Sequence, residues 1–511
     1  MNRRNMLKLS AGATCTFLGS VLPAVSSAAP KRQDVERWDV FEASFEGPGS
    51  GNPFIDVALE AIFTIGHRSV TVSGFYDGAS IYRVRFMPDE PGRWSYRTSS
   101  RTVTLDGHTG EFTCVPASDK NRGPVSVRDT HHFGYADGSR YYPFGTTCYA
   151  WVHQSDEVQQ QTLRTLASSP FNKLRMLVFP KSYEYNRKEP ERYPFARNAD
   201  GVSDFTQINP AFFQHIESRI GDLRNLGIEA DVILFHPYDR WGYASMPPEA
   251  DDRYLRYVIA RFAAYRNVWW SLANEYDLMR AKSTVDWDRF ARIVQQEDPY
   301  SHLRSIHFSK AMYDYSRDWV THASLQTTHF EKGAEWRAEW AKPVIYDECQ
   351  YEGNIPSRWG NLSGQEMAYR FWLGAVAGCY VTHGETYLSK DDIIWWSHGG
   401  ELHGTSPARI AFLRKLVEAS KGGLDPLNSY YLSAEHTERR NRNVPPDYLL
   451  YYFDEHQPGE YEFPLPTEAT YRAELIDPWT MQITLLKDEC KGATKLTLPS
   501  EPHRAVRFMR M

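Results

Sequence analysis

The sequence has few cysteines, no long block of one charge and, beyond its first thirty residues, no apolar run that approaches a membrane span. Five of its six cysteines are scattered through the chain: Cys114, Cys148, Cys349, Cys379 and Cys490. An odd, dispersed set predicts neither a disulfide framework nor a zinc site. The net charge is −6, and the sequence has no long basic block. Both features disfavour nucleic acid or an anionic membrane as a partner.

The N-terminal segment has the form of an export signal. Arg3 and Arg4 precede an apolar stretch, and small residues follow from Ser26 to Ala29. The arginine pair indicates the twin-arginine route. We therefore expect residues 1–29 to be a cleaved signal and the protein to be exported by a bacterium, to the periplasm or the medium.

The length and the turn-rich ends of the chain predict three domains. A chain of 511 residues with 41% hydrophobic and 24% charged residues is typical of a soluble globular protein with about three domains. Residues 31–118 contain short strand-like runs separated by Gly, Pro, Asp and Asn, which predicts an N-terminal β-sandwich. Similar runs return over 428–511 and predict a C-terminal β-sandwich.

The middle of the chain, residues 122–425, predicts a (β/α)₈ TIM barrel. Eight apolar strand-like runs alternate there with amphipathic helical stretches, including a shorter piece near 309–318. The competing fold is an open doubly wound sheet. That fold would need a glycine-rich phosphate turn after an early strand, and the sequence has none.

Two carboxylates fall at predicted strand ends, where a barrel places its active site. Glu275 follows Asn274 at the end of the fourth strand, and Glu348 ends the seventh. Glycoside hydrolysis uses such a pair, one carboxyl protonated and the other ionised. We expect Glu275 and Glu348 to be catalytic and Asn274 to hold a sugar hydroxyl. Arg175, on the second strand, is placed to keep Glu348 ionised; the alternative is that Asp347 is the functional acid.

Other polar residues fall at the same predicted rim. Imidazoles lie on or at the ends of several strands: His236, His307, His329 and His383. We expect His236, His329 and His383 to bind substrate or tune the acid, although each also fits a structural role, as His307 does. Glu385, on the eighth strand, is the main rival nucleophile or a hydroxyl ligand. No carboxylate and histidine have the helical spacing of a metal site, so we expect no metal and no cofactor.

Aromatic residues make up 14% of the chain, with 15 Trp and 31 Tyr. Such a content fits either large cores or sugar stacking. Five rings follow predicted strand ends and are candidates for the sugar site: Trp151, Tyr238, Trp241, Trp395 and Trp396. Long connections after the third and eighth strands favour a site closed at one end, hence exo cleavage.

Several of these segments resemble a known group of enzymes. "SLANEYD", "PVIYDE" and "FNKLRML" resemble the strand motifs of clan A glycoside hydrolases, with Arg175 in the matching place. "YADGSRYYPFGTTCYAWVH" resembles the first strand of the apiosidase-like branch, in which a β-sandwich commonly precedes the barrel. The resemblance covers the barrel well and the two sandwiches loosely. It implies a retaining mechanism with Glu275 as acid/base and Glu348 as nucleophile.

The sequence therefore predicts a retaining, exo-acting glycosidase that removes a terminal sugar from a plant or microbial polysaccharide or oligosaccharide. A transglycosylase would use the same residues. A non-catalytic carbohydrate-binding surface protein is the alternative from another class, and loss of one carboxylate would mark it. The expected partner is a carbohydrate, without nucleic acid and without a membrane span.

Overall fold

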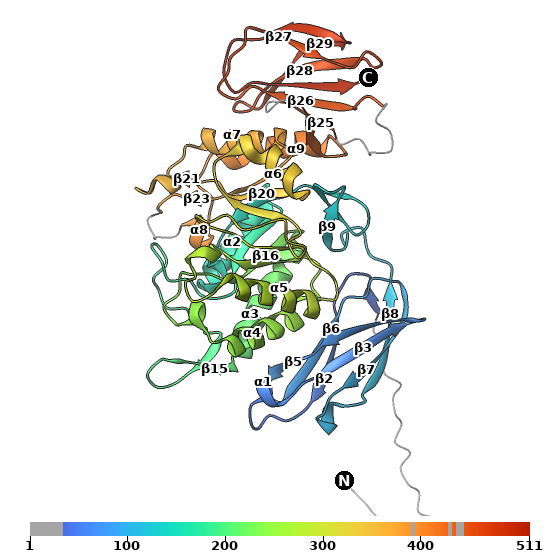
Figure 1. Ribbon diagram of the computed structural model, residues 1–511, viewed down its shortest axis with the longest axis vertical. Helices are drawn as coiled ribbons and strands as arrows, with labels where there is room; N and C mark the ends of the chain where they lie inside the picture. Colours follow the sequence, from blue (N-terminus) through green and yellow to red (C-terminus); the bar gives the residue numbers. More distant parts are fainter. Residues whose placement is uncertain (1–33, 390–393, 428–431, 436–443) are drawn as a thin grey trace, which may run out of the picture.

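The computed structural model describes residues 34–389, 394–427, 432–435 and 444–511, so the expected export signal lies outside the described residues. A β-sandwich, a barrel and a second β-sandwich follow one another along the long axis (Figure 1). Within the described residues, no helix has the length and apolar character to cross a membrane.

The N-terminal sandwich consists of two antiparallel-rich sheets. One has the order β1 (Asp34–Glu36), β8 (Thr109–Val115), β7 (Gly92–Ser99), β3 (Glu60–Ile65) and β4 (Arg68–Ser73). The other has the order β2 (Phe41–Glu46), β6 (Ile81–Phe86) and β5 (Phe75–Gly78), with the short α1 (Pro53–Asp56) beside it. Alternate residues of both sheets meet in a core that includes Phe41, Phe63 and Trp94.

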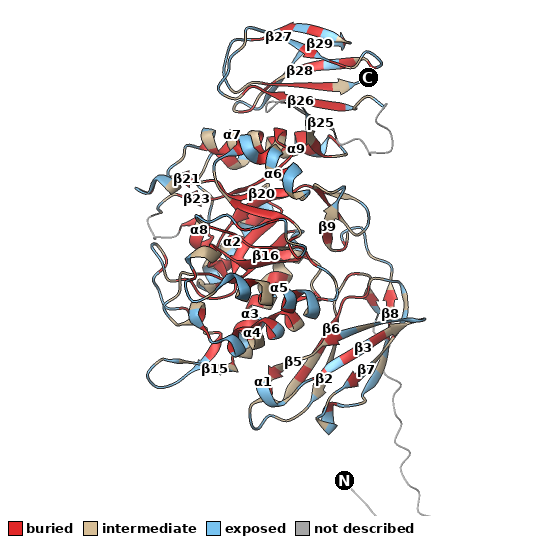
Figure 2. Ribbon diagram, viewed as in Figure 1, coloured by how far each residue is buried: buried red, intermediate tan, exposed pale blue. Residues whose placement is uncertain are grey.

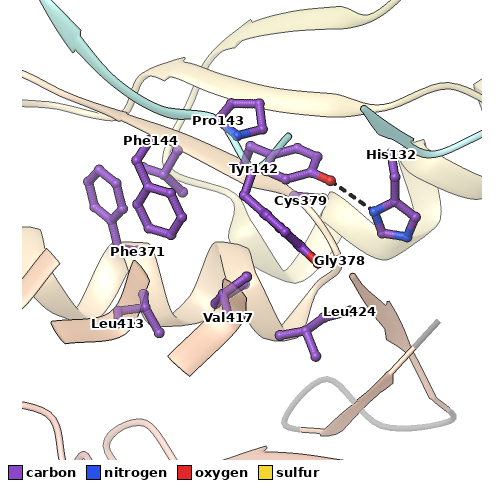
Figure 3. A pocket seen from close by; sticks show the side chains of 13 residues that line it. His132, Tyr142, Pro143, Phe144, Phe371, Gly378, Cys379, Leu413, Val417 and Leu424 are labelled. Carbon is purple, nitrogen blue, oxygen red and sulfur yellow. Dashed lines mark hydrogen bonds between the residues drawn. The ribbon is translucent and has the colours of Figure 1, made fainter. Parts of the chain in front are cut away.

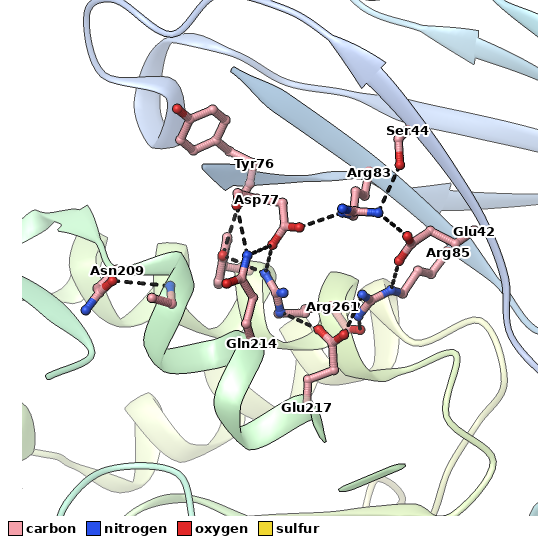
Figure 4. A network of polar contacts seen from close by, with 12 residues as sticks. Glu42, Ser44, Tyr76, Asp77, Arg83, Arg85, Asn209, Gln214, Glu217 and Arg261 are labelled. Atoms are coloured by element: carbon pink, nitrogen blue, oxygen red, sulfur yellow. Dashed lines mark hydrogen bonds and ion pairs between the residues drawn. The ribbon is translucent and has the colours of Figure 1, made fainter. Parts of the chain in front are cut away.

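A buried ionic network joins this sandwich to two barrel helices, α3 (Pro210–Asn225) and α4 (Pro248–Phe262) (Figure 4). Arg85 of β6 lies 2.7 Å from Glu217 of α3. Arg261 of α4 lies 2.7 Å from the same glutamate and 2.8 Å from Asp77 of β5. Because unpairing a buried charge is costly, the network fixes the sandwich against the side of the barrel.

The barrel has the eight predicted parallel strands. They are β12 (Phe144–Thr147), β13 (Lys173–Leu177), β16 (Glu229–Phe235), β17 (Val268–Ala273), β18 (Arg304–Ser305), β19 (Ala323–Gln326), β20 (Val344–Glu348) and β22 (Tyr380–His383). β22 pairs with β12, and a bridge between His307 and Ser324 links the segment after β18 to β19. The strands are buried on both faces, as expected for a parallel sheet covered by helices (Figure 2).

Helices cover the outside of the barrel: α2 (Asp156–Ser168), α3, α4, α5 (Thr284–Glu297), α6 (Gly333–Trp340), α7 (Gly364–Val376) and α9 (Ser406–Glu418). The predicted helical piece near 309–318 is wrong, because that connection consists of turns and bends. The Asp277 carboxylate accepts the backbone N–H groups of Ser309, Lys310 and Ala311 at 2.7–2.9 Å. These side-chain bonds hold the backbone in a turn instead of a helix.

A small sheet closes the N-terminal end of the barrel. It consists of β9 (Val125–Arg128), β10 (His132–Tyr135) and β11 (Arg140–Tyr141). Phe133 packs on Trp269 and Tyr380 at the beginnings of β17 and β22. An apolar cavity lies beside this small sheet and is lined by residues that include Phe144, Phe371 and Leu413 (Figure 3). At its edge the His132 ring forms a hydrogen bond with the Tyr380 hydroxyl.

The C-terminal sandwich lies over α7 and α9 (Figure 1). Its larger sheet has the order β24 (Leu424–Pro426), β25 (Leu432–Glu435), β26 (Tyr448–Tyr452), β31 (Ala505–Arg510), β28 (Tyr471–Asp477) and β29 (Gln482–Cys490). The smaller pairs β27 (Glu460–Pro464) with β30 (Ala493–Thr497). Tyr452 packs on Trp372 of α7 with ring centroids 5.5 Å apart, which joins sandwich and barrel.

Candidate active site

Two carboxylates share one pocket at the C-terminal end of the barrel. Glu275 directly follows Asn274 after β17, and Glu348 is the last residue of β20. Both line the same pocket. They are 6% and 5% exposed, so each has lost most of its hydration. Burying a carboxylate costs free energy, so such a group is expected to be hydrogen-bonded, paired with a cation or required for catalysis.

Glu275 adopts a left-handed backbone conformation, φ 50° and ψ 55°. This region is unfavourable for a residue with a side chain, and such strain clusters at functional sites. The turn is held because the N–H of Tyr276 donates to the His307 carbonyl at 2.9 Å. The turned carboxylate accepts the Tyr238 hydroxyl and the Gln326 side-chain amide, the latter at 3.1 Å.

Glu348 accepts the hydroxyl of Tyr149 and lies 3.9 Å from the guanidinium of Arg175. Burial and the charge of Glu275 raise the pKa of Glu348 to about 7, while Arg175 and the Tyr149 and Tyr351 hydroxyls oppose the rise. The two carboxylates are thus electrostatically coupled. The negative charge of Glu275 thus makes ionisation of Glu348 less favourable.

Arg175 connects the two carboxylate environments. It is fully buried on β13 and donates to the Tyr149 hydroxyl at 3.2 Å and to the Asn274 side-chain oxygen at 3.3 Å. The Asn274 amide nitrogen in turn lies 3.4 Å from Glu275. A continuous chain of polar contacts therefore runs from Glu348 through Tyr149 and Asn274 to Glu275.

A second ionic layer lies deeper in the barrel. Lys173 lies 2.7 Å from Asp231 and 2.8 Å from Asp347. Ser324 also donates to Asp347, at 2.6 Å. Burial alone would raise the pKa of Asp347, but Lys173 and Arg175 hold it well below its usual range. Asp347 therefore serves as a counter-ion of the barrel interior, and its neighbour Glu348 is the acid that reaches the pocket.

Seven of the sixteen residues that line the pocket are aromatic. They come from the segments that follow β12, β13, β16 and β20 and from α8 (Trp395–His398): Tyr149, Tyr183, Tyr185, Tyr238, Tyr351, Trp359 and Trp396. The connection after β13 is long and contains the hairpin β14 (Phe195–Arg197) and β15 (Ser203–Ile208). Aromatic rings on which a sugar can stack, next to a pair of carboxylates, are typical of a site that binds and cleaves a glycoside.

The comparisons with known proteins agree with this geometry. The family described as "Apiosidase-like, catalytic domain" matches residues 128–403, more than half of the chain. A crystal structure of a protein from Bacteroides vulgatus assigned as a glycoside hydrolase is 40% identical, covers 94% of this chain and 100% of its own, and has a TM-score of 0.88. The chain belongs to the apiosidase-like family. It has the fold of the glycoside hydrolases and is a glycosidase by family.

More distant comparisons add the fold alone. A family 5 glycoside hydrolase from Bacteroides vulgatus is 16% identical, covering 76% of this chain and 94% of its own with a TM-score of 0.57. Two families described only as domains of unknown function match residues 34–101 and 439–509, in the two sandwiches. None of the curated proteins compared with the chain matches it.

Two predicted imidazole ligands of this apiosidase-like barrel lie away from the pocket lining. His236 is buried and uses both ring nitrogens on backbone, at 3.1 Å from the Phe179 carbonyl and 3.1 Å from the Tyr238 N–H. It supports Tyr238, which does line the pocket. His329 has a side chain that is 68% exposed and pairs with Glu331. Both expectations of direct sugar contact are corrected by these placements.

Glu385, two residues after the end of β22, has its carboxylate engaged outside the pocket lining. Glu385 accepts the N–H groups of His403 and Gly404, and Glu352 of β21 (Glu352–Gly353) accepts those of Thr405 and Ser406. With His383 they form, within the described part of the chain, a buried group with the composition of a metal site. Both carboxylates already anchor the segment before α9, so Glu385 is not the nucleophile of this pocket.

His383 and three of the predicted aromatic residues are packing residues instead. His383 stacks on Phe171 and contacts the Thr146 hydroxyl, outside the pocket lining. Trp151 is fully buried in the core. Trp395 donates to Thr146 at 2.8 Å, and Trp241 donates to Glu189 at 3.0 Å. Trp396 and Tyr238 remain as wall residues, because both line the pocket.

The sequence reasoning missed four residues around the carboxylates: Tyr149, Lys181, Gln326 and Tyr351. Each follows or ends a barrel strand within a few residues, so the strand-end rule that selected Glu275 could have selected them too. Gln326 is the last residue of β19, three positions before His329, the predicted strand end.

Proposed function

We propose that the protein is a retaining glycoside hydrolase that removes a terminal sugar by double displacement. The observation that carries the proposal is the pair Glu275 and Glu348, buried in one pocket at the ends of β17 and β20 and each bonded to a tyrosine hydroxyl. Retaining enzymes need two nearby carboxyl groups, one as nucleophile and one as acid/base.

In the first step Glu348 attacks the anomeric carbon while Glu275 protonates the departing oxygen. In the second step Glu275 takes a proton from water, which then releases the sugar from Glu348. Arg175 and the Tyr149 and Tyr351 hydroxyls favour the ionised form of Glu348. Glu275 acts as the general acid through a hydrogen bond that its carboxyl group donates to the glycosidic oxygen of the bound substrate.

The neighbouring amides support substrate orientation in this proposal. Asn274 and Gln326 both line the pocket and both approach Glu275, at 3.4 and 3.1 Å. Their remaining hydrogen-bonding capacity suits a sugar hydroxyl next to the reaction centre. Stacking on Trp396, Trp359 and the pocket tyrosines would hold the ring itself.

The cleavage of a terminal residue is supported by the long connection after β13, which adds Tyr183 and Tyr185 to the wall. A plant or microbial polysaccharide or oligosaccharide fits the export signal expected at residues 1–29. A transglycosylase remains a variant of the same chemistry, with a sugar hydroxyl in place of water. A binding protein is disfavoured because both carboxylates are present and buried together.

The test is hydrolysis of a panel of aryl pyranosides and furanosides by the wild type, Glu275→Gln and Glu348→Gln. We expect one glycoside to be cleaved, both variants to lose several orders of magnitude, and azide to restore turnover in the Glu275 variant. Product anomers read by proton NMR give the stereochemistry. Full activity in Glu348→Gln, or first-formed product of inverted configuration, would contradict the proposal.

A further inference from the structure

A buried lysine contacts aromatic residues of the active-site wall. Lys181 follows β13 and is 1% exposed. Its backbone carbonyl accepts the Asn186 side-chain amide at 2.7 Å. Its ammonium nitrogen has no hydrogen-bond partner among the residues that the structure describes. An unpaired buried ammonium is costly, so it needs a compensating interaction or a function.

Four aromatic rings surround this ammonium group. The nitrogen lies 3.7 Å from the centroid of the Trp396 ring. It lies 5.0 Å from the ring of Tyr149, 5.4 Å from Tyr238 and 5.5 Å from Tyr183. All four distances are within the range of cation–π attraction, and tryptophan is the best partner for it. The rings form an aromatic cage that the protein fills with its own side chain.

The cage and the pocket wall are made of the same residues. Tyr149, Tyr183, Tyr238 and Trp396 all line the pocket, whereas Lys181 is not among its lining residues. Two of these rings also bond the proposed catalytic groups, since Tyr149 donates to Glu348 and Tyr238 donates to Glu275. One ammonium group thus contacts both phenols that hold the carboxylates.

The charges around Lys181 favour its protonated form up to neutral pH. Burial lowers the pKa of Lys181 to about 7, although Glu348 and Glu275 oppose the decrease. The imidazoles that feel its charge, His236 and His398, have pKa values lowered to about 3 and about 4, mainly by burial, so they are neutral there. The caging phenols have raised pKa values and remain neutral too.

We propose that Lys181 is a positioning residue of the active site. It fixes the Tyr149 and Tyr238 rings against Glu348 and Glu275, and its positive charge stabilises the ionised form of Glu348. This inference rests on the proposed glycosidase function. It also explains why an ammonium group without a hydrogen-bond partner among the described residues is kept in the fold at a cost in stability, as functional groups often are.

The test compares Lys181→Met, which keeps the length of the side chain and removes its charge, with Lys181→Arg, which keeps the charge. Lys332→Met, at an exposed lysine, is the matched control. We expect Lys181→Met to lose at least about tenfold in kcat/KM, and the acidic limb of its pH profile to move to higher pH, because removing a nearby cation raises a carboxylate pKa. Its thermal midpoint should rise below pH 7, since a buried unpaired charge is gone. Lys181→Arg should keep the wild-type limb.

A purely structural lysine would give the opposite pattern. The thermal midpoint of Lys181→Met would then fall or stay, and the pH profile would keep its shape, which overturns the proposal. Wild-type turnover measured in parallel separates the two hypotheses, because a wild type that cleaves no glycoside counts against the proposed function alone.

A measurement on the unaltered protein covers the case in which the variants do not fold. In protein labelled with ¹³C-lysine, the cage predicts one ε-methylene signal that ring currents shift upfield and that titrates near neutral pH. A set of lysine signals that all lie at ordinary shifts and titrate near pH 10.4 would overturn the cage and the proposal with it.

Discussion

The Tyr149 hydroxyl lies 2.9 Å from the side-chain oxygen of Asn274, which joins the segment after β12 to the end of β17. The same hydroxyl bonds Glu348 and receives a hydrogen bond from Arg175. With its oxygen held by Arg175, the phenol is oriented to give its proton to the carboxylate. Tyr149 is therefore the residue through which the strand-end carboxylates are aligned.

Replacement of Tyr149 tests this alignment. Tyr149→Phe should reduce kcat/KM by about 10²–10³, the range for removing one preorganised donor to a reacting group. The acidic limb of the pH profile should move to higher pH, because a lost hydrogen bond to the ionised form raises the pKa of Glu348. Tyr96→Phe, in the N-terminal sandwich, is the control. Equal loss in both variants would mean a general effect on folding.

Removal of Arg175 should cost stability as well as activity. Its guanidinium is fully buried between Asp231, Asp347 and Glu348. Arg175→Met leaves these carboxylates without one cation, which should lower the free energy of unfolding by about 3–5 kcal/mol. Arg175→Lys should lose less stability but remain far less active, because lysine does not reach Tyr149 and Asn274 together. Urea unfolding gives the first result and kinetics the second.

The folded state should lose stability in acid through Asp347. The pKa of Asp347 is lowered in the folded protein by Lys173 and Arg175. A lowered carboxyl pKa contributes stability that is fully present above the unfolded value of about 3.9 and is lost as the pH falls toward the folded value. The stability gap between the wild type and Asp347→Asn should therefore be largest at neutral pH and shrink below about pH 4. The exposed Asp200→Asn variant should show no such gap, whereas a gap that is constant with pH would contradict the assignment.

Glu385 provides a contrast with Glu348. Since its carboxylate holds the N–H groups of His403 and Gly404, Glu385→Gln should lower the thermal midpoint and reduce kcat by less than about tenfold. Glu348→Gln should lose several orders of magnitude with little change in midpoint. Activity lost equally in both would return Glu385 to the role of candidate nucleophile.

The barrel could be predicted because its eight strands are short apolar runs that alternate with amphipathic helices. The carboxylates could be predicted because strand ends form the mouth. What the sequence did not settle was which way neighbouring side chains face. Trp395 and Trp396 are adjacent on the four-residue α8, yet the first bonds Thr146 and the second lines the pocket. Successive helical residues point about 100° apart, and no sequence signal told which of the two faced the sugar site.

The missing helix near 309–318 and the neglected Gln326 have local causes. The carboxylate of Asp277, over thirty residues earlier in the chain, accepts hydrogen bonds from the backbone N–H groups at the start of the predicted helix. β19 ends at Gln326, three residues before His329, the predicted strand end. The position of Lys181 beside the active site could not be predicted from the sequence either. Its cage is assembled from three other segments of the chain, brought together only by the fold.

The most direct test of the central claim is covalent trapping of the glycosyl intermediate. An activated aryl 2-deoxy-2-fluoro glycoside of whichever sugar the wild type releases would be incubated with the enzyme and followed by intact-mass and peptide mass spectrometry. The account predicts one added glycosyl group, located on Glu348, and none in Glu348→Gln. A label on another carboxylate would contradict the assigned nucleophile. Turnover with inverted product and no label would contradict double displacement itself.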